Sequence, residues 1–214
     1  MSFDTLAPHY RWMESVLAGP LLQQCRTRYL GQLATARNVL VLGPGRSRFA
    51  AAMLTAAPDA RLTLVDSSHG MLERLGRDLR DGGAAMDRVT LVHADAREWT
   101  PSSAPFDTIA THFFLDCFAP VDLAALVARV AQWSVPGTRW LVSDFRMPAA
   151  GWRRHRALAI HALMYAFFRA ATGIAACAVT PPDAFMARAR FRLVQRQLSN
   201  LGLLHADLWV RSNP

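Results

Sequence analysis

Lysine is absent from this chain of 214 residues, so arginine supplies all 24 basic side chains. The formal net charge is +8 at pH 7, yet the arginines are scattered and form one tight group, Arg153, Arg154 and Arg156. Nucleic-acid binding needs basic residues gathered on one face, so a nucleic-acid partner is disfavoured. The arginine group opens an apolar helical pattern, which makes peripheral contact with a membrane surface a separate expectation.

Cysteine is scarce as well, because Cys25, Cys117 and Cys177 are far apart and form no Cys-x-x-Cys pair. This spacing supports neither a zinc site nor a disulfide framework, and no metal is expected. The longest apolar stretch, residues 157–171, contains a histidine and an arginine and is too short to span a bilayer. Residues 1–20 lack the apolar run of a signal peptide. We therefore expect a cytoplasmic protein.

Apolar residues are plentiful, at 52% of the chain against 19% charged, which is enough for one sizeable core. Short apolar segments alternate with longer helical patterns, the arrangement of parallel strands covered by helices. We expect parallel strands at residues 39–42, 61–65, 89–93, 106–111 and 139–143. Two later segments, residues 191–198 and 203–210, are joined by a tight turn and must be antiparallel to each other.

Helices are expected between these strands and in one long insertion. The patterns predict helices at residues 48–57, 68–80, 120–133, 152–172 and 183–189. The stretch between Asp144 and the terminal strand pair interrupts the alternation, so we expect residues 146–183 to form a helical cap over the substrate site. Residues 1–36 are expected to be an N-terminal helical segment, and residues 1–214 a single domain.

A glycine turn, Gly43-Pro44-Gly45, follows the first strand. Glycine is needed where a backbone turns sharply and a ligand lies against it. Asp66 ends the second strand 21 residues beyond Gly45, a spacing that suits a carboxylate accepting hydrogen bonds from ribose hydroxyls. Asp95 closes the third strand and could accept from an adenine amino group, with the Ala96 backbone nearby. Three such features at successive strand ends predict a nucleotide-type ligand.

A nicotinamide cofactor is the competing ligand for this turn. A dinucleotide-binding loop has a third glycine or alanine three residues after the second, so that helix and strand pack closely. Arg48 stands at that position and is too bulky, and Pro44 removes one backbone donor from the loop. The loop therefore favours S-adenosylmethionine over NAD, and an NAD-dependent oxidoreductase is kept as an alternative.

Five segments resemble, in order, the motifs of class I S-adenosylmethionine-dependent methyltransferases. They are VLVLGPGRSRFA, LTLVDSSHGML, VTLVHADARE, FDTIATHFFLDCF and PGTRWLVSDFRMP. Ser47 departs from the first motif, which usually has a glycine there. The resemblance extends from Phe3 to Trp209. It implies an α/β fold with a Rossmann-like, doubly wound, seven-stranded sheet of order 3-2-1-4-5-7-6, the last strand antiparallel.

The resemblance also implies a set of contacts to S-adenosylmethionine, whose product is S-adenosylhomocysteine. Asp66 would bind the ribose, Asp95 and Ala96 the adenine, and Met71 would pack near the adenine. The full set of expected cofactor contacts is Tyr10, Gly43, Pro44, Gly45, Asp66, Ser67, Met71, Asp95, Ala96, Thr111 and His112.

Within that family the chain looks most like the C-methyltransferases of ubiquinone and menaquinone synthesis and their small-molecule relatives. The likeness lies in Phe3-Asp4 with Tyr10, in Asp144 to Pro148, and in the aromatic segment from Met164 to Phe168. His112 to Asp116 stand where the quinone enzymes have a Gly-Leu-Arg-Asn segment. The implied substrate is a small apolar or aromatic molecule, such as a phenol, an enol or a quinone-like compound.

Methyl transfer is an in-line attack on a sulfonium methyl, so the protein mostly aligns and desolvates the reactants. A general base is needed only when the nucleophile must lose a proton. The candidate catalytic residues are His112, Asp116, Asp144, Arg146 and Tyr165. His112 is the first choice of base, because imidazole titrates near working pH. Asp116 could instead cap a helix or pair with an arginine, and Asp144 could form an ion pair with Arg146.

A catalytically inactive binding protein that keeps the methyltransferase fold is the remaining alternative. The departure at Ser47 favours it, whereas Asp66, Asp95 and both loop glycines argue against it, because a scaffold has no need of them. The oligomeric state, monomer or homodimer, is left open by the sequence.

Overall fold

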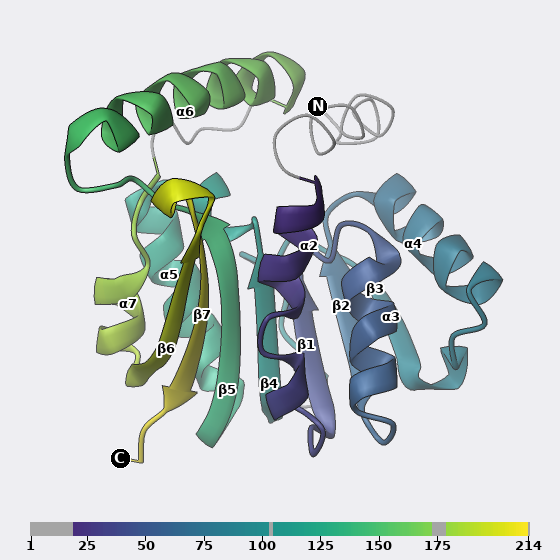
Figure 1. Ribbon diagram of the computed structural model, residues 1–214. Coiled ribbons are helices and arrows are strands. Elements are labelled where there is room, and N and C mark those ends of the chain that lie inside the picture. Colours follow the sequence, from purple (N-terminus) through teal and green to yellow (C-terminus); the bar gives the residue numbers. More distant parts are fainter. Residues whose placement is uncertain (1–18, 103–104, 173–178, 214) are drawn as a thin grey trace.

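The computed structural model describes residues 19–102, 105–172 and 179–213 (Figure 1). Its centre is a seven-stranded sheet of order β3-β2-β1-β4-β5-β7-β6, as the sequence predicted. The strands are β1 (Asn38–Leu42), β2 (Arg61–Asp66), β3 (Val89–His93), β4 (Phe106–His112), β5 (Ser134–Phe145), β6 (Phe191–Ser199) and β7 (Leu204–Arg211). β7 runs antiparallel to both of its neighbours, β5 and β6, which confirms the predicted Rossmann-like, doubly wound sheet.

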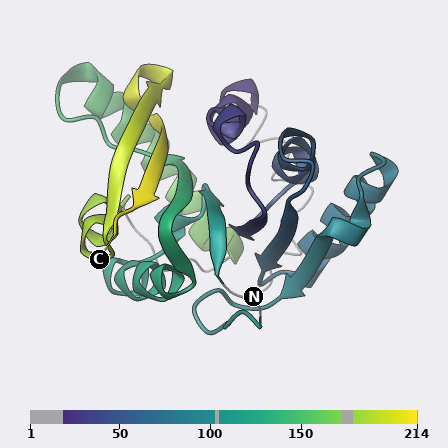
Figure 2. The same ribbon diagram turned by 90° about the horizontal axis from the view of Figure 1, so that it is seen from below.

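Helices cover both faces of the sheet and its upper edge (Figures 1 and 2). α2 (Gly19–Thr27), α3 (Ser47–Ala56) and α4 (His69–Asp81) pack on one face, and α5 (Pro120–Gln132) and α7 (Asp183–Arg188) on the other. α6 (Gly151–Thr172) crosses above the carboxyl ends of the strands (Figure 1). The long strand-to-strand insertion predicted from the sequence is therefore largely one helix.

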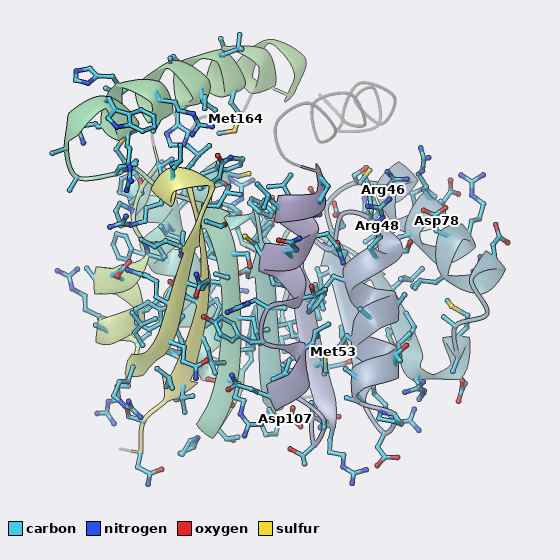
Figure 3. The ribbon with its side chains drawn as sticks, viewed as in Figure 1. Arg46, Arg48, Met53, Asp78, Asp107 and Met164 are labelled. Atoms are coloured by element: carbon cyan, nitrogen blue, oxygen red, sulfur yellow. The ribbon has the colours of Figure 1, made fainter. Side chains whose placement is uncertain are left out.

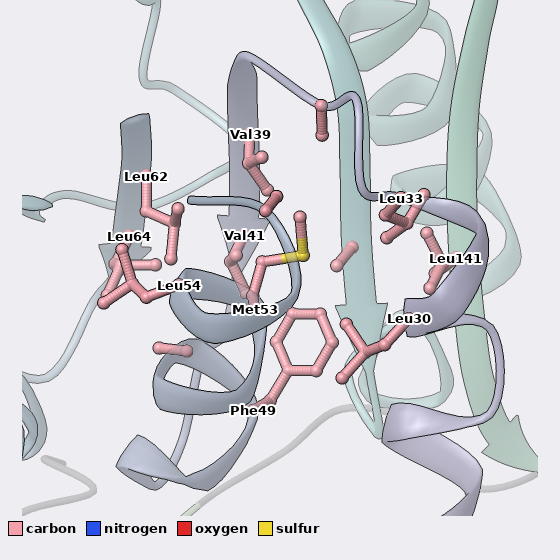
Figure 4. Close-up of a cluster of buried hydrophobic side chains, with 14 of the residues drawn as sticks. Leu30, Leu33, Val39, Val41, Phe49, Met53, Leu54, Leu62, Leu64 and Leu141 are labelled. Carbon is pink, nitrogen blue, oxygen red and sulfur yellow. The ribbon is translucent and has the colours of Figure 1, made fainter. Parts of the chain in front are cut away.

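Alternation along the central strands divides the core into two layers. Val39 and Val41 of β1 face α3, where Phe49 and Met53 fill the space between helix and sheet (Figure 4). The intervening Leu40 and Leu42 face α5 on the other side, in agreement with the two-residue period of a strand. Because both faces of these strands are covered, every one of these side chains is apolar.

β5 begins earlier than predicted. Its onset was expected at Arg139, after a Pro136-Gly137 turn, whereas Ser134 already pairs with Phe106. The turn is an irregularity inside the strand, with Gly137 at φ +87°. Thr138 stabilises it, because its hydroxyl accepts a hydrogen bond from Val135 N at 2.9 Å and donates one to the Phe106 carbonyl at 2.8 Å.

Asp107 lies near the start of β4, at the end of the sheet opposite to α6 (Figure 3). Its Oδ2 accepts hydrogen bonds from the backbone N of Arg37 and of Asn38, at 2.8 and 2.9 Å. This carboxylate fixes the start of β1 against β4. The carboxyl ends of the strands, where ligands bind in open α/β sheets, lie at the other end of the sheet.

Candidate functional site

The glycine turn after β1 leaves room for a ligand at one of its two glycines. Gly43 and Gly45 both have left-handed backbones, with φ of +61° and +58°. A Cβ on Gly43 would lie 2.3 Å from the Phe114 ring, so that glycine is required by packing inside the protein. Among the residues that the structure describes, a Cβ on Gly45 would meet nothing within 4 Å. The turn therefore presents bare backbone to open space at Gly45, as a bound molecule requires.

Asp66 ends β2 beside the first turn of α4. Its Oδ1 accepts a hydrogen bond from Ser68 N at 2.9 Å, which orients the carboxylate. The Ser68 hydroxyl caps α4 by accepting a hydrogen bond from Met71 N at 3.2 Å. The Ser67 side chain is exposed, and its carbonyl lies 3.1 Å from His93 Nε2. Three predicted contacts, Asp66, Ser67 and Met71, thus surround one turn.

Asp95 follows β3 and lies in the loop next to Asp66, because Ala94 N donates to the Asp66 carbonyl at 3.0 Å. Its carboxylate is held by Arg97, whose Nη2 lies 2.6 Å from Oδ2, and this contact lowers the pKa of Asp95. Ala96 is buried in the core. The structure brings the two predicted acids to neighbouring strand ends, and Arg97 is a partner that sequence reasoning missed.

Thr111 and His112 end β4 with side chains on opposite faces of the sheet. The Thr111 hydroxyl accepts a hydrogen bond from Trp140 Nε1 at 3.0 Å inside the core, so its side chain has a packing role. His112 is 7% exposed and lies edge-on against Phe49, with ring centroids 4.4 Å apart. Among the described residues, neither nitrogen of this ring has a hydrogen-bond partner.

Burial, assisted by the positive charge of Arg26, lowers the pKa of His112 to about 3. The imidazole is therefore neutral at working pH. The reason for choosing His112 as base, titration near neutrality, does not hold in this buried setting.

Two buried carboxyl groups meet beyond β4 and β5. Asp116 is 7% and Asp144 2% exposed, and Asp116 N donates to Asp144 Oδ2 at 3.2 Å. Their carboxyl groups also hydrogen-bond to each other. Burial raises the pKa of both, and the proximity of Asp116 raises that of Asp144 further. Like charges this close do not both ionise readily, so the raised pKa values oppose loss of the second proton from the pair.

This pairing replaces the alternatives considered for Asp116 and Asp144. α5 is capped at Ala119, so Asp116 does not cap it. In the part of the chain that the structure describes, no ion pair joins Asp144 to Arg146. Arg146 instead anchors its backbone, donating from N to the Leu203 carbonyl at 2.7 Å.

Three further polar residues, missed by sequence reasoning, lie beside this pair. The register of β5 and β7 places His205 opposite Asp144. His205 Nδ1 lies 2.9 Å from Oδ2 of the fully buried Asp207, to which Arg196 donates two hydrogen bonds at 2.8 and 2.6 Å. Burial alone would raise the pKa of Asp207, but Arg196 and His205 hold it below its usual value. The sequence feature that could have identified this cluster is the pair His205 and Asp207, two residues apart in a mostly apolar strand.

α6 covers this group from above. Ala157, His161 and Met164 are buried on its lower side, and Met164 points toward the sheet in Figure 3. The His161 ring lies edge-on to Phe145 at 5.8 Å, and burial lowers the pKa of His161. The predicted Tyr165 lies within α6, but its side chain falls outside the described part of the structure, as does the whole of Tyr10.

Within residues 19–102, 105–172 and 179–213, no cluster of His, Cys, Asp and Glu is arranged to hold a metal ion. Across the same ranges, no helix has the length and apolar character needed to cross a membrane.

Comparison with known proteins agrees with this geometry. Residues 39–137 match the protein-family profile described as a methyltransferase domain. The mitomycin 7-O-methyltransferase MmcR has a similar structure, with a TM-score of 0.70 at 19% identity, over 99% of this chain and 61% of that one. This chain is thus about three fifths as long as that protein.

Two other structures match over more of their own length. The N-methyltransferase NodS from Bradyrhizobium japonicum gives a TM-score of 0.63 at 14% identity, covering 91% of this chain and 98% of NodS. Magnesium protoporphyrin IX methyltransferase from Synechocystis, solved with bound S-adenosylhomocysteine, gives 0.66 at 16% identity, covering 89% and 83%. At these identities the likeness concerns the fold, and the chain shares the Rossmann-like fold of these three methyltransferases.

Proposed function

We propose that this protein transfers a methyl group from S-adenosylmethionine to a small apolar or aromatic molecule. The observation that carries the proposal is the assembly of Gly45, Asp66 and Asp95 at the ends of three adjacent strands, with open space beside Gly45. These residues fit the cofactor: bare backbone for its amino-acid part, and two carboxylates for its ribose and adenine. The family profile covers the same segment.

When bound, S-adenosylmethionine supplies an electrophilic methyl group. Asp66, whose carboxylate is oriented by Ser68 N, would hold the ribose hydroxyls. Asp95 would accept a hydrogen bond from the adenine amino group once the Arg97 side chain moves off its carboxylate. The Ala96 backbone would also contact the adenine. Arg46 and Arg48, labelled in Figure 3, follow the glycine turn in the chain and would attract the carboxylate of the amino-acid part. They would equally suit a pyrophosphate, so NAD is the ligand to compare.

On the substrate side, the Asp116–Asp144 pair is our candidate for proton transfer. A pair that retains one proton can donate a hydrogen bond from one carboxyl while the other accepts. A substrate hydroxyl would lose its proton to the accepting oxygen as its new bond to carbon forms. His205, held by Asp207, would stabilise the charge on the pair. His112 remains a candidate cofactor contact, and Arg146 and Tyr165 candidate substrate contacts.

The surroundings of this pair favour an apolar substrate. Phe113 and Phe145 lie 5.3 Å apart between ring centroids beneath α6, with His161 and Met164 above them. We accordingly propose that residues 146–183 act as the cap and that the substrate is phenol-, enol- or quinone-like. The branch of quinone C-methyltransferases and the cytoplasmic location remain predictions from the sequence.

Calorimetric titration with S-adenosylhomocysteine, and separately with NAD, tests the proposal. We expect micromolar binding of S-adenosylhomocysteine and none of NAD. Asp66→Ala should weaken binding by about a hundredfold or more, because two hydrogen bonds to a charged acceptor are lost. Asp59→Ala is the matched control, since Asp59 is an exposed acid paired with Arg37 at 2.8 Å, and it should bind as the wild type does.

Each other outcome identifies a different function. Binding of NAD in place of S-adenosylhomocysteine would overturn the proposal in favour of an oxidoreductase. Binding of S-adenosylhomocysteine, but no methylation across a panel of phenols, enols and quinones, would favour the inactive binding protein.

A further inference from the structure

α6 has two apolar sides, and the protein covers one of them. Ala157, His161 and Met164 recur at spacings of four and three residues and are 1%, 4% and 3% exposed. They form the side that rests on the sheet edge. Large apolar side chains on the opposite side of such a helix would gain from being covered by a partner.

The opposite side is open. Trp152 is 62%, Leu158 45% and Leu163 72% exposed, and Ala159 and Ala162 lie exposed between them. Trp152, Leu158 and Leu163 are among the few large apolar side chains on the described surface that are exposed to this degree. By the spacing of helical residues, Trp152, Ala159 and Leu163 lie opposite to the buried side and Leu158 lies on its flank, with the exposed His155 among them. We call this group of exposed side chains the outer face of α6.

Positive charge borders one end of the outer face. Arg153 and Arg154 are exposed, and the Arg153 guanidinium lies 5.9 Å from the centre of the Trp152 ring. Arg156 is turned away and donates to Asn200 Oδ1 at 2.9 Å. The sequence of α6 contains no aspartate or glutamate. The outer face therefore joins apolar side chains and arginines with no acid on the same helix to balance them.

We infer that the outer face of α6 binds an anionic membrane surface, with the helix lying in the interface. Tryptophan and leucine would enter the boundary between headgroups and acyl chains, while Arg153 and Arg154 would pair with lipid phosphates. The inference goes beyond the proposed methyl transfer and does not depend on it.

A second copy of this chain fits the outer face less well. Two such faces packed together would enclose arginines from both helices, and neither helix carries an acid to pair with them. An enclosed charge without a partner is strongly destabilising. An anionic lipid surface supplies negative charge together with an apolar layer, and so satisfies both parts of the face.

The position of α6 gives the contact a direction. The helix crosses above the carboxyl ends of the strands (Figure 1), and its buried side lies over Phe145. A membrane on the outer face would therefore lie next to the edge of the sheet where Asp116 and Asp144 meet, and the opposite edge, marked by Asp107, would face water.

Co-sedimentation of the whole protein with vesicles tests the inference. We expect binding to vesicles of phosphatidylcholine with phosphatidylglycerol, little binding to phosphatidylcholine alone, and weaker binding at high salt. Leu163→Glu should reduce binding by about tenfold or more, because it puts a negative charge into the interface. Arg153→Gln with Arg154→Gln should reduce it roughly thirtyfold. Both changes are on exposed side chains, so thermal unfolding should be unchanged.

Val121→Glu is the matched control, because Val121 is an 81% exposed apolar residue on α5, away from the outer face, and should leave vesicle binding unchanged. Equal sedimentation of the wild type with both vesicle types, or an equal loss for Val121→Glu and Leu163→Glu, would overturn the inference. A dimer in analytical ultracentrifugation that Leu163→Glu dissociates, without vesicle binding, would assign the face to a second copy.

Discussion

The carboxyl ends of the strands form two halves of the molecule that differ in how far their charged side chains are exposed to water. Around β1, β2 and β3, the acids Asp66 and Asp95 are half-buried, and Arg97 neutralises Asp95 at the surface. Around β4, β5 and β7, Asp116, Asp144 and Asp207 are buried outright. Water screens the first half, so its charges cost little and can exchange partners for a ligand. The second half has no such screening, and its charges persist only because each has a partner.

The largest expected effect is on the buried half. Asp207→Ala removes the acceptor for both Arg196 and His205 and should lower the free energy of unfolding by about 3–5 kcal/mol, because two side chains lose a buried hydrogen-bond partner at once, although Arg196 keeps its pair with Asp183 at 2.9 Å. Asp59→Ala, which breaks the exposed pair with Arg37, should cost less than about 1 kcal/mol. Urea unfolding measures both, and equal losses would contradict the contrast between buried and screened charge.

A second experiment separates packing from binding within the glycine turn. Gly45→Ala should cost about 1–2 kcal/mol for its left-handed backbone. Gly43→Ala has the same backbone strain and also the clash with Phe114, so it should cost about 1–3 kcal/mol more. For the variant that stays folded, Gly45→Ala, titration should show weaker binding of S-adenosylhomocysteine. Equal stability losses for the two variants would mean that Phe114 moves aside freely.

The smallest expected effect is a difference in pH dependence. An aspartate in the unfolded chain ionises near pH 4, about its model-peptide value. Because the pKa of Asp144 is raised in the folded protein, the folded state holds a proton that the unfolded chain has lost. Wild-type stability should therefore fall as pH rises from about 4 through the raised pKa. Asp144→Asn cannot ionise, so its melting temperature should fall less over this range.

Asp95→Asn should change the pH dependence of stability in the opposite direction. The pKa of Asp95 is lowered by Arg97, so its contribution to stability is present above the unfolded pKa and disappears as pH falls. This variant should lose a little stability near pH 7 and none in acid. If melting temperatures of Asp144→Asn and Asp95→Asn follow the same pH slope, the two halves do not differ as described.

The two halves also differ in how far the sequence predicts them. Gly45, Asp66 and Asp95 each lie at the end of a strand or within three residues of it, so a local pattern is enough to place them at the carboxyl ends of the strands. The sheet order came with the family resemblance and is confirmed. His205 meets Asp144 only through the antiparallel register of β5 and β7, which no local pattern specifies. The depressed pKa of His112 was equally hidden, because it depends on burial against Phe49.

The position of β7 has a consequence for synthesis. This strand follows all others in the chain, yet it lies inside the sheet between β5 and β6. In a nascent chain that emerges N-terminus first, the edge of β5 therefore stays unpaired until residues 204–211 have left the ribosome. During that time Trp140 lacks Trp209, its partner across the two strands. Open strand edges of this kind readily pair with other chains. The growing polypeptide is thus most prone to aggregate just before the sheet closes, when a chaperone would protect it most.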